Sequence, residues 1–161
     1  MTIHYPYLPR DRTILYLPAD DPYMRLARDA ARWYSLDKIQ KVGAIIHKDR
    51  KIIGYGANGS NYHEIHGCER KHLGSRTGED YHLCPGCDPR NHAEAKAIAC
   101  ARESGHDTTN ASMYLWGHWW ACKPCWDEII RARIANLYLL EGSERLFDRD
   151  HPDNIIGRQF T

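Results

Sequence analysis

The sequence lacks any long apolar segment. None of its 161 residues belongs to an apolar run near the length of about 20 that spans a bilayer, and Met1 to Arg12 contains no apolar signal core. These absences predict a cytoplasmic protein that does not associate with membranes.

The sequence also has almost no net charge and no internal repeats. Lys and Arg number 22 and Asp and Glu 21, which gives a formal charge of +1. Domains that bind nucleic acid usually carry a clear positive excess, so a nucleic-acid partner is disfavoured, although a basic patch on one face is compatible with this total. With 42% hydrophobic and 27% charged residues and no linker, we expect a single globular domain over residues 1–161.

Periodicity predicts alternating strands and helices. Residues 1–20 contain several prolines and predict an extended arm with a short strand over 13–17, and Asp21-Pro22 begins a helix that ends near Tyr34. The other predicted elements are a hairpin of strands over 42–47 and 51–57, a helix over 91–104, a strand over 112–116, a helix from Pro124, a strand over 137–140, a short helix over 144–147 and a last strand over 154–160. This order indicates an α/β layered domain with a mixed sheet.

Residues 60–91 have neither helical nor strand periodicity and are rich in cysteine and histidine. We call this segment the Cys/His-rich insertion. A loop of such length inside a compact domain is usually functional or is ordered by something other than a hydrophobic core.

The most informative pattern for function consists of two separate segments, Asn91-His92-Ala93-Glu94-Ala95 and Cys122-Lys123-Pro124-Cys125. His92, Cys122 and Cys125 are three zinc ligands, one short of a tetrahedron, and a catalytic zinc needs that open position for water. Glu94 supplies a carboxylate that can handle protons beside the water without binding the metal. H-x-E followed by C-x-x-C is typical of zinc-dependent base deaminases.

Each half of this pattern has a simpler explanation. Asn91 and Glu94 have the spacing of a capping box, in which Glu94 would only support the start of a helix. The C-x-x-C pair alone is compatible with a redox pair or with half of a structural zinc site. The two halves together favour the catalytic interpretation.

These motifs resemble those of the zinc-dependent cytidine and deoxycytidylate deaminase superfamily, over roughly residues 21–141. The resemblance implies a three-layer α/β/α fold around a five-stranded mixed sheet. It also implies hydrolytic deamination, in which zinc-bound hydroxide attacks C4 of cytosine while Glu94 shuttles protons. Substrate contacts are expected near Asn58 and Ala93.

The sequence departs from the superfamily pattern before the cysteine pair. Ala121 stands where most members have proline, and the preceding residues are the bulky Gly117-His118-Trp119-Trp120. Trp119 and Trp120 could stack on a substrate base. Equally, they could fill the core against neighbouring helices.

A second metal site is predicted within the insertion. Cys68, Cys84 and Cys87 lie in a polar segment, where they are poorly explained as core residues, and Cys84-Pro85-Gly86-Cys87 has zinc-knuckle spacing. The fourth ligand of this structural zinc is one of His63, His66 and His72, among which the sequence does not choose. An extra zinc here also occurs in some deoxycytidylate deaminases that the chain resembles.

The preferred function is conversion of dCMP to dUMP and ammonia by a homo-oligomeric enzyme, because the long segment between Asn58 and His92 resembles the deoxycytidylate branch. Candidate phosphate-binding cations of the insertion are Arg70, Lys71, Arg76 and Arg90. Alternatives are a deaminase of a base in RNA or single-stranded DNA, a deaminase of free cytidine or deoxycytidine, and a catalytically inactive zinc-stabilised binding module. Glu94 argues against the last, since a structural zinc site has no use for it.

Overall fold

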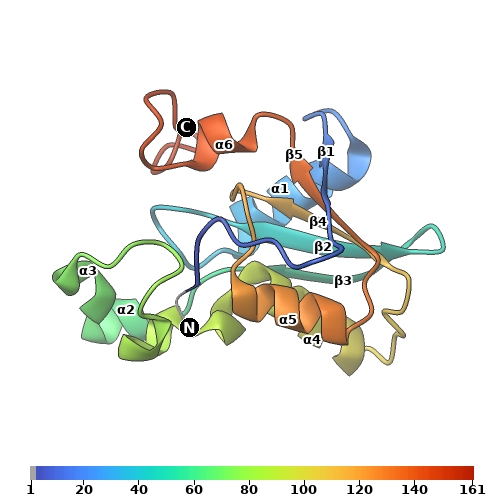
Figure 1. Cartoon of the computed structure of the whole chain (residues 1–161), viewed down its shortest axis with the longest axis horizontal. Coiled ribbons are helices and arrows are strands. Elements are labelled where there is room, and N and C mark those ends of the chain that lie inside the picture. The colour runs from blue at the N-terminus through green and yellow to red at the C-terminus, as the bar shows by residue number, and fades with distance from the viewer. Residues whose placement is uncertain (1–2) are drawn as a thin grey trace.

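A computed structural model describes residues 3–161 and contains one five-stranded mixed sheet (Figure 1). In spatial order its strands are β1 (Ile14–Leu17), β5 (Asn136–Leu140), β4 (Ser112–Trp116), β2 (Gly43–Lys48) and β3 (Lys51–Ala57). β5 pairs in parallel with both β1 and β4, whereas β2 is antiparallel to both β4 and β3. The predicted hairpin and mixed sheet are therefore confirmed.

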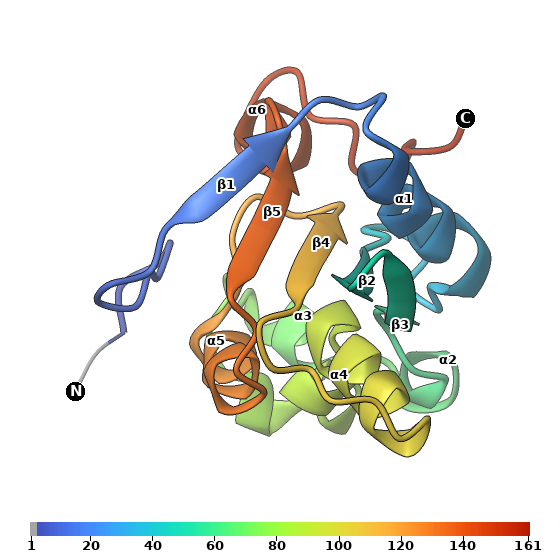
Figure 2. The same ribbon diagram turned by 90° about the vertical axis from the view of Figure 1, so that its right-hand side faces the viewer.

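Helices cover both faces of this sheet. The helix α1 (Pro22–Tyr34) lies on one face, and α4 (Ala93–Glu103) and α5 (Lys123–Arg131) lie on the other (Figures 1 and 2). Each face has its own buried cluster, one around α4 and α5 and one that joins α1 to the C-terminal helix α6 (Ser143–Phe147). This arrangement confirms the three-layer α/β/α fold.

Local sequence explains where α1 begins and which face it buries. The Asp21 carboxylate accepts hydrogen bonds from the backbone N–H groups of Tyr23 and Met24, at 3.0 and 2.9 Å, and Pro22 occupies the first helical position. The buried residues are Met24, Ala27, Ala30 and Ala31. Their helical spacing directs one face of α1 onto β2 and β4.

The C-terminal segment departs from the prediction. No strand forms over residues 154–160, which instead make a series of turns. The Gln159 side chain accepts from the backbone N–H of Lys41 and donates to its carbonyl, at 2.7 and 3.0 Å. Ile155 and Phe160 meanwhile pack against the cluster around α1. The apolar residues that suggested a strand thus cover a helix, and their backbone does not join the sheet.

The insertion is more regular than its sequence indicates. It contains α2 (Tyr62–His66), α3 (Glu69–Leu73) and three single 3-10 turns, Tyr81–Leu83, Pro85–Cys87 and Pro89–Asn91. Figure 1 shows α2 and α3 projecting to one side of the sheet. Neither helix has a buried residue, so side chains from elsewhere in the insertion must order it.

No helix within residues 3–161 combines the length and the apolar character needed to cross a bilayer.

Two glycines of β3 let α4 approach the sheet closely. A Cβ atom at Gly56 would lie 2.5 Å from the backbone nitrogen of Ala97 and 2.7 Å from the carbonyl oxygen of Ala93, and one at Gly54 would lie 2.5 Å from the carbonyl oxygen of Ala97. These contacts are with helix backbone, which cannot rotate away. The close approach of α4 to β3 therefore depends on the absence of a side chain at Gly54 and Gly56.

We predict that Gly56→Ala lowers the free energy of unfolding by about 1–3 kcal/mol, because the added methyl overpacks the interface between β3 and α4. Urea denaturation measures this change. Ala99→Ser is the matched control, since Ala99 is exposed on α4 and exposed substitutions usually change stability by less than about 0.5 kcal/mol. Equal stability of Gly56→Ala and the native chain would contradict the close-packing argument.

Candidate metal centre and active site

Three predicted metal ligands converge from two helix starts. His92 is the N-cap of α4, Cys122 is the N-cap of α5, and Cys125 lies in the first turn of α5. His92 Nδ1 lies 3.3 Å from Cys125 Sγ and 3.4 Å from Cys122 Sγ, and all three ligand atoms lie within 4.8 Å of one another. We call His92, Cys122 and Cys125 the first cluster. Its donors suit zinc with one coordination position left open.

The surroundings of the first cluster favour a thiolate. The hydrogen bond from Cys125 is the main cause that lowers the pKa of Cys122 to about 5, with a further contribution from His92. The hydrogen bond with Cys122, together with burial, raises the pKa of Cys125 well above its usual range. The positive ends of two helix dipoles face this site. One thiol thus ionises readily, and a bound cation would favour ionisation of the second.

Glu94 lies beside the first cluster, in the first turn of α4, with 5% of its surface exposed. Burial, and then the negative charge of Cys122, raise the pKa of its carboxyl group to about 7, while His92 has a smaller opposing effect. An acid with a pKa near neutrality can both accept and return a proton during a reaction. The arrangement therefore places a proton carrier next to an open metal position.

A second cluster of four ligands forms inside the insertion, from His63, Cys68, Cys84 and Cys87. His63 Nε2 lies 3.2 Å from Cys84 Sγ and 3.5 Å from Cys87 Sγ, and the Sγ atoms of Cys68 and Cys87 are 3.6 Å apart. We call these four residues the second cluster. A set of one imidazole and three thiols is typical of closed structural zinc sites.

The structure thereby distinguishes between the histidines that the sequence left open. His63 points its ring into the second cluster, whereas His66 and His72 lie outside it and are exposed. His63 and His66 both belong to α2 and lie about one helical turn apart, so their side chains leave the helix on similar sides. Only the packing of α2 against the turn at Cys84 decides between them.

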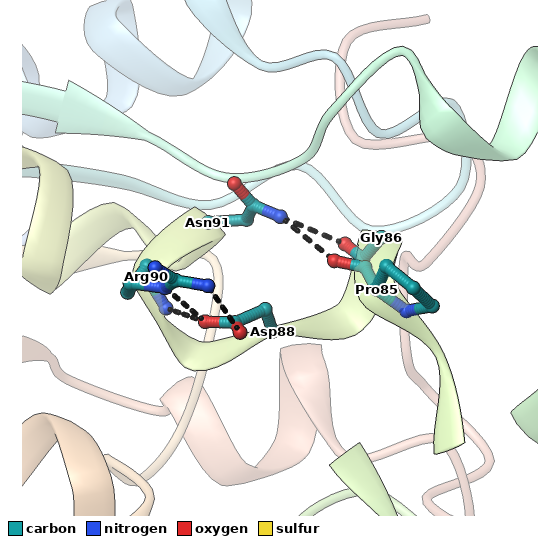
Figure 3. Close-up of polar contacts among 5 residues, drawn as sticks. All are labelled: Pro85, Gly86, Asp88, Arg90 and Asn91. Atoms are coloured by element: carbon teal, nitrogen blue, oxygen red, sulfur yellow. Dashed lines mark hydrogen bonds and ion pairs between the residues drawn. The ribbon is translucent and has the colours of Figure 1, made fainter. Parts of the chain in front are cut away.

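The segment from the second cluster to His92 is braced by side chains (Figure 3). The Asn91 amide donates to the carbonyl oxygens of Pro85 and Gly86, each at 3.3 Å, and the Asp88 carboxylate binds the Arg90 guanidinium at 3.0 Å. The capping-box alternative for Asn91 and Glu94 is wrong, because the N-cap of α4 is His92 and the Asn91 side chain faces the preceding turn.

The two predicted substrate contacts, Asn58 and Ala93, lie close to the start of α4. Asn58 Oδ1 accepts from the backbone N–H of Val42 at 2.9 Å, and Asn58 Nδ2 donates to the carbonyl of Gln40 at 2.8 Å, so most of the amide holds the loop together. The backbone N–H of Gly59 donates to the Asn91 carbonyl at 3.0 Å, which ties this loop to the start of α4. Ala93 is fully buried.

The aromatic residues before Cys122 differ in exposure. Trp120 belongs to the buried core, with 5% of its surface exposed, and its ring lies 4.6 Å from that of Tyr5 in the N-terminal arm. Trp119 is half-buried and packs against both core clusters. The core-filling alternative therefore describes Trp120, and Trp119 retains an accessible part.

The candidate phosphate-binding cations also differ in their surroundings. Arg70 donates to the carbonyls of Glu79 and Arg76 at 2.7 and 2.8 Å, and Arg90 is paired with Asp88. Within residues 3–161, no ion pair or side-chain hydrogen bond engages the guanidinium of Arg76, which is exposed, as is Lys71. Arg76 and Lys71 are thus the freer cations of the four.

Two residues that connect distant segments around the first cluster carried no recognisable sequence signal. Gln40 is buried, donates to the Gly117 carbonyl at 3.3 Å and accepts from Arg149 at 3.2 Å, so it connects the segment before β2 to the end of β4 and to the C-terminal segment. Tyr81 packs edge-on against His92. These contacts join segments far apart in the chain, and no local spacing could have shown them.

Comparison with known proteins identifies the class. Residues 18–141 match the family described as the cytidine and deoxycytidylate deaminase zinc-binding region. The chain belongs to this family and is a zinc-dependent hydrolytic deaminase, which confirms the superfamily resemblance. Among curated protein sequences, none matches the chain significantly.

Solved structures agree with the fold. The dCMP deaminase of cyanophage S-TIM5, in complex with dCMP and dUMP, is 22% identical over 76% of this chain and 82% of its own, with a TM-score of 0.52. Guanine deaminase of Bacillus subtilis is 22% identical over 73% and 60%, with a TM-score of 0.46. A two-activity deaminase and reductase of Thermotoga maritima is 23% identical over 73% of this chain but only 28% of its own, with a TM-score of 0.44. At 22% identity, the likeness to the cyanophage enzyme establishes the fold alone.

We predict that Cys125→Ser lowers the zinc content by one equivalent per chain, because serine is a poor zinc ligand and the remaining two donors cannot hold the ion. Metal analysis of protein purified without chelator provides the measurement. Cys100→Ser is the matched control, since Cys100 belongs to neither cluster. An unchanged zinc content in Cys125→Ser would show that the first cluster does not hold the ion.

Proposed function

We propose that the protein deaminates dCMP to dUMP and ammonia. The observation that carries this proposal is the insertion, a long segment with four metal ligands that runs directly into His92. Such a segment resembles the deoxycytidylate branch of the family more than the shorter nucleoside deaminases. The fold likeness to a phage enzyme crystallised with dCMP and dUMP supports the same assignment.

The zinc ligands and Glu94 have different roles in the proposed reaction. Zinc held by His92, Cys122 and Cys125 would supply a Lewis acid that activates water for attack on C4 of the cytosine ring. Glu94 takes a proton from the water, protonates the ring nitrogen and assists the departure of ammonia. Its burial keeps the transferred proton away from bulk solvent. One water is consumed for each ammonia released, so the reaction balances without another reactant.

Binding of the nucleotide is assigned to residues beside the first cluster and to exposed cations. Asn58 and Ala93 would contact the sugar and the base through the amide and backbone groups, and Trp119 has the accessible aromatic surface for stacking. Arg76 and Arg149 are exposed guanidinium groups suited to a phosphate. Neutral overall charge is in keeping with a small nucleotide and not with a long nucleic acid.

Homo-oligomerisation is proposed as well. Exposed aromatic side chains gather where α1 ends beside β3, with Trp33 69%, Tyr34 57% and Tyr55 47% exposed. The rings of Tyr34 and Tyr55 lie 5.3 Å apart and form one surface. A large exposed aromatic surface is a common site of contact between protein copies.

For the substrate, we expect much faster turnover of dCMP than of deoxycytidine, since only the nucleotide offers a phosphate to the cations. A panel of dCMP, CMP, deoxycytidine, cytidine, RNA and single-stranded DNA, assayed for released ammonia, measures this preference. Equal rates on dCMP and deoxycytidine would reject the nucleotide assignment, and turnover confined to oligonucleotides would favour the nucleic-acid alternative.

The control for this panel is Glu94→Gln, which keeps the size of the side chain and cannot carry the proton. Turnover should fall by about 10²–10⁴-fold for every substrate, with zinc content retained. Undiminished turnover with the preferred substrate would instead mean that Glu94 is not the proton carrier.

A second, structural zinc is also proposed, held by His63, Cys68, Cys84 and Cys87. We predict that His63→Ala loses one equivalent of zinc and that the insertion then becomes sensitive to proteolysis, because its helices have no buried core of their own. His66→Ala and His72→Ala are matched controls that should keep both zinc ions. A single zinc per native chain, or loss of zinc equally in all three variants, would contradict the proposal.

A further inference from the structure

Tyr81 connects the insertion to the first cluster. Its ring packs against that of His92 with 4.9 Å between the ring centroids and an angle of 76° between the planes. Its hydroxyl oxygen accepts a hydrogen bond from the backbone N–H of Gly78 at 3.1 Å. The contact with His92 is therefore an edge-to-face packing of a firmly held ring.

Arg70 connects Tyr81 to the second cluster. Its guanidinium carbon lies 4.5 Å from the centroid of the Tyr81 ring, and Arg70 lies in the first turn of α3, whose N-cap is Cys68 of the second cluster. Two of its donors are held by the carbonyls of Glu79 and Arg76. The guanidinium plane is thus held by three contacts and can act as a rigid support for the Tyr81 ring.

His92 has unusual need of such a support. Within residues 3–161, the hydrogen bonds of its ring all run through Nδ1, to the two thiols that share the first cluster. Metal-binding imidazoles are usually oriented by a hydrogen bond from the other ring nitrogen to a carboxylate or a carbonyl. For His92, orientation therefore depends on packing, and Tyr81 supplies an aromatic ring at the required place.

We propose that Arg70 and Tyr81 are positioning residues that couple the second cluster to the first, so that a metal held by the insertion fixes the orientation of His92. The inference rests on the proposed zinc sites and extends them to a relation between the two. It gives the insertion a role in catalysis without contact with the substrate. It also explains why Arg70, an obvious phosphate candidate in the sequence, has its donors engaged by carbonyls of the insertion.

Substitution of Tyr81 tests the support. Tyr81→Leu keeps an apolar side chain but removes the ring, and we expect zinc to leave the first cluster about 10-fold faster in the presence of a chelating dye. Tyr81→Phe keeps the ring and loses only the hydrogen bond to Gly78, so its release rate should match that of the native chain. Release phases are assigned to the clusters with Cys125→Ser and His63→Ala.

A double-mutant cycle tests the coupling. His63→Ala should speed zinc release from the first cluster in the native background and should add nothing in the Tyr81→Leu background, because the connection is already broken. If either single variant released zinc from the first cluster at the rate of the native chain, the proposal would be overturned. It would also be overturned if the increase in release rate in the double variant equalled the product of the increases in the two single variants. A multiplying effect would mean that Tyr81 only fills the core.

These measurements follow the metal and use no substrate. Release rates that match the expectation while the dCMP panel fails would reject the substrate assignment and leave the coupling intact. The reverse result, with dCMP turned over and the two clusters independent, would reject the coupling alone.

Discussion

The structure depends on one constraint, which is that an imidazole and two thiols from segments thirty residues apart must meet within the reach of one ion. Neither segment can satisfy this alone. The imidazole sits at the start of α4, and the position of that helix is set by its backbone contact with Gly54 and Gly56 of β3. The thiols sit at the start of α5, which follows the buried central strand β4. The five-stranded sheet thus positions both helix starts and thereby sets the distance between the ligands.

The same convergence that builds the first cluster creates its chemistry. Burying two thiols and a carboxyl group together would be costly if all were charged, so the site distributes its protons unevenly. Cys122 becomes acidic while the pKa values of Cys125 and Glu94 rise. A metal ion then has one ready ligand, and Glu94 retains a proton affinity near neutrality. The raised pKa of Glu94 therefore comes first from its burial and then from the negative charge of the neighbouring ligand Cys122.

Much of this could be predicted from the sequence, because local signals specified it. The spacings H-x-E and C-x-x-C, the cap at Asp21 and the periodicity of the helices all act within a few residues. The sequence could not choose His63 over His66, since that choice depends on how α2 packs against a turn twenty residues later. The strand predicted over residues 154–160 was wrong for a similar reason. The apolar side chains of this segment pack against the cluster around α1, and its backbone does not pair with the sheet. Long-range packing, which spacing does not encode, decided each case.

The insertion shows what such packing can add to a site defined by local motifs. Its two helices bury no side chain, so their order depends on four ligands drawn together at one point. With the proposed second zinc bound there, the free energy of metal binding would contribute to the free energy of folding of this segment. Because Arg70 packs on Tyr81 and Tyr81 packs on His92, the same free energy would, in the proposed coupling, also restrain a ligand of the first cluster. An element that contributes little hydrophobic core can in this way stiffen the centre of the molecule.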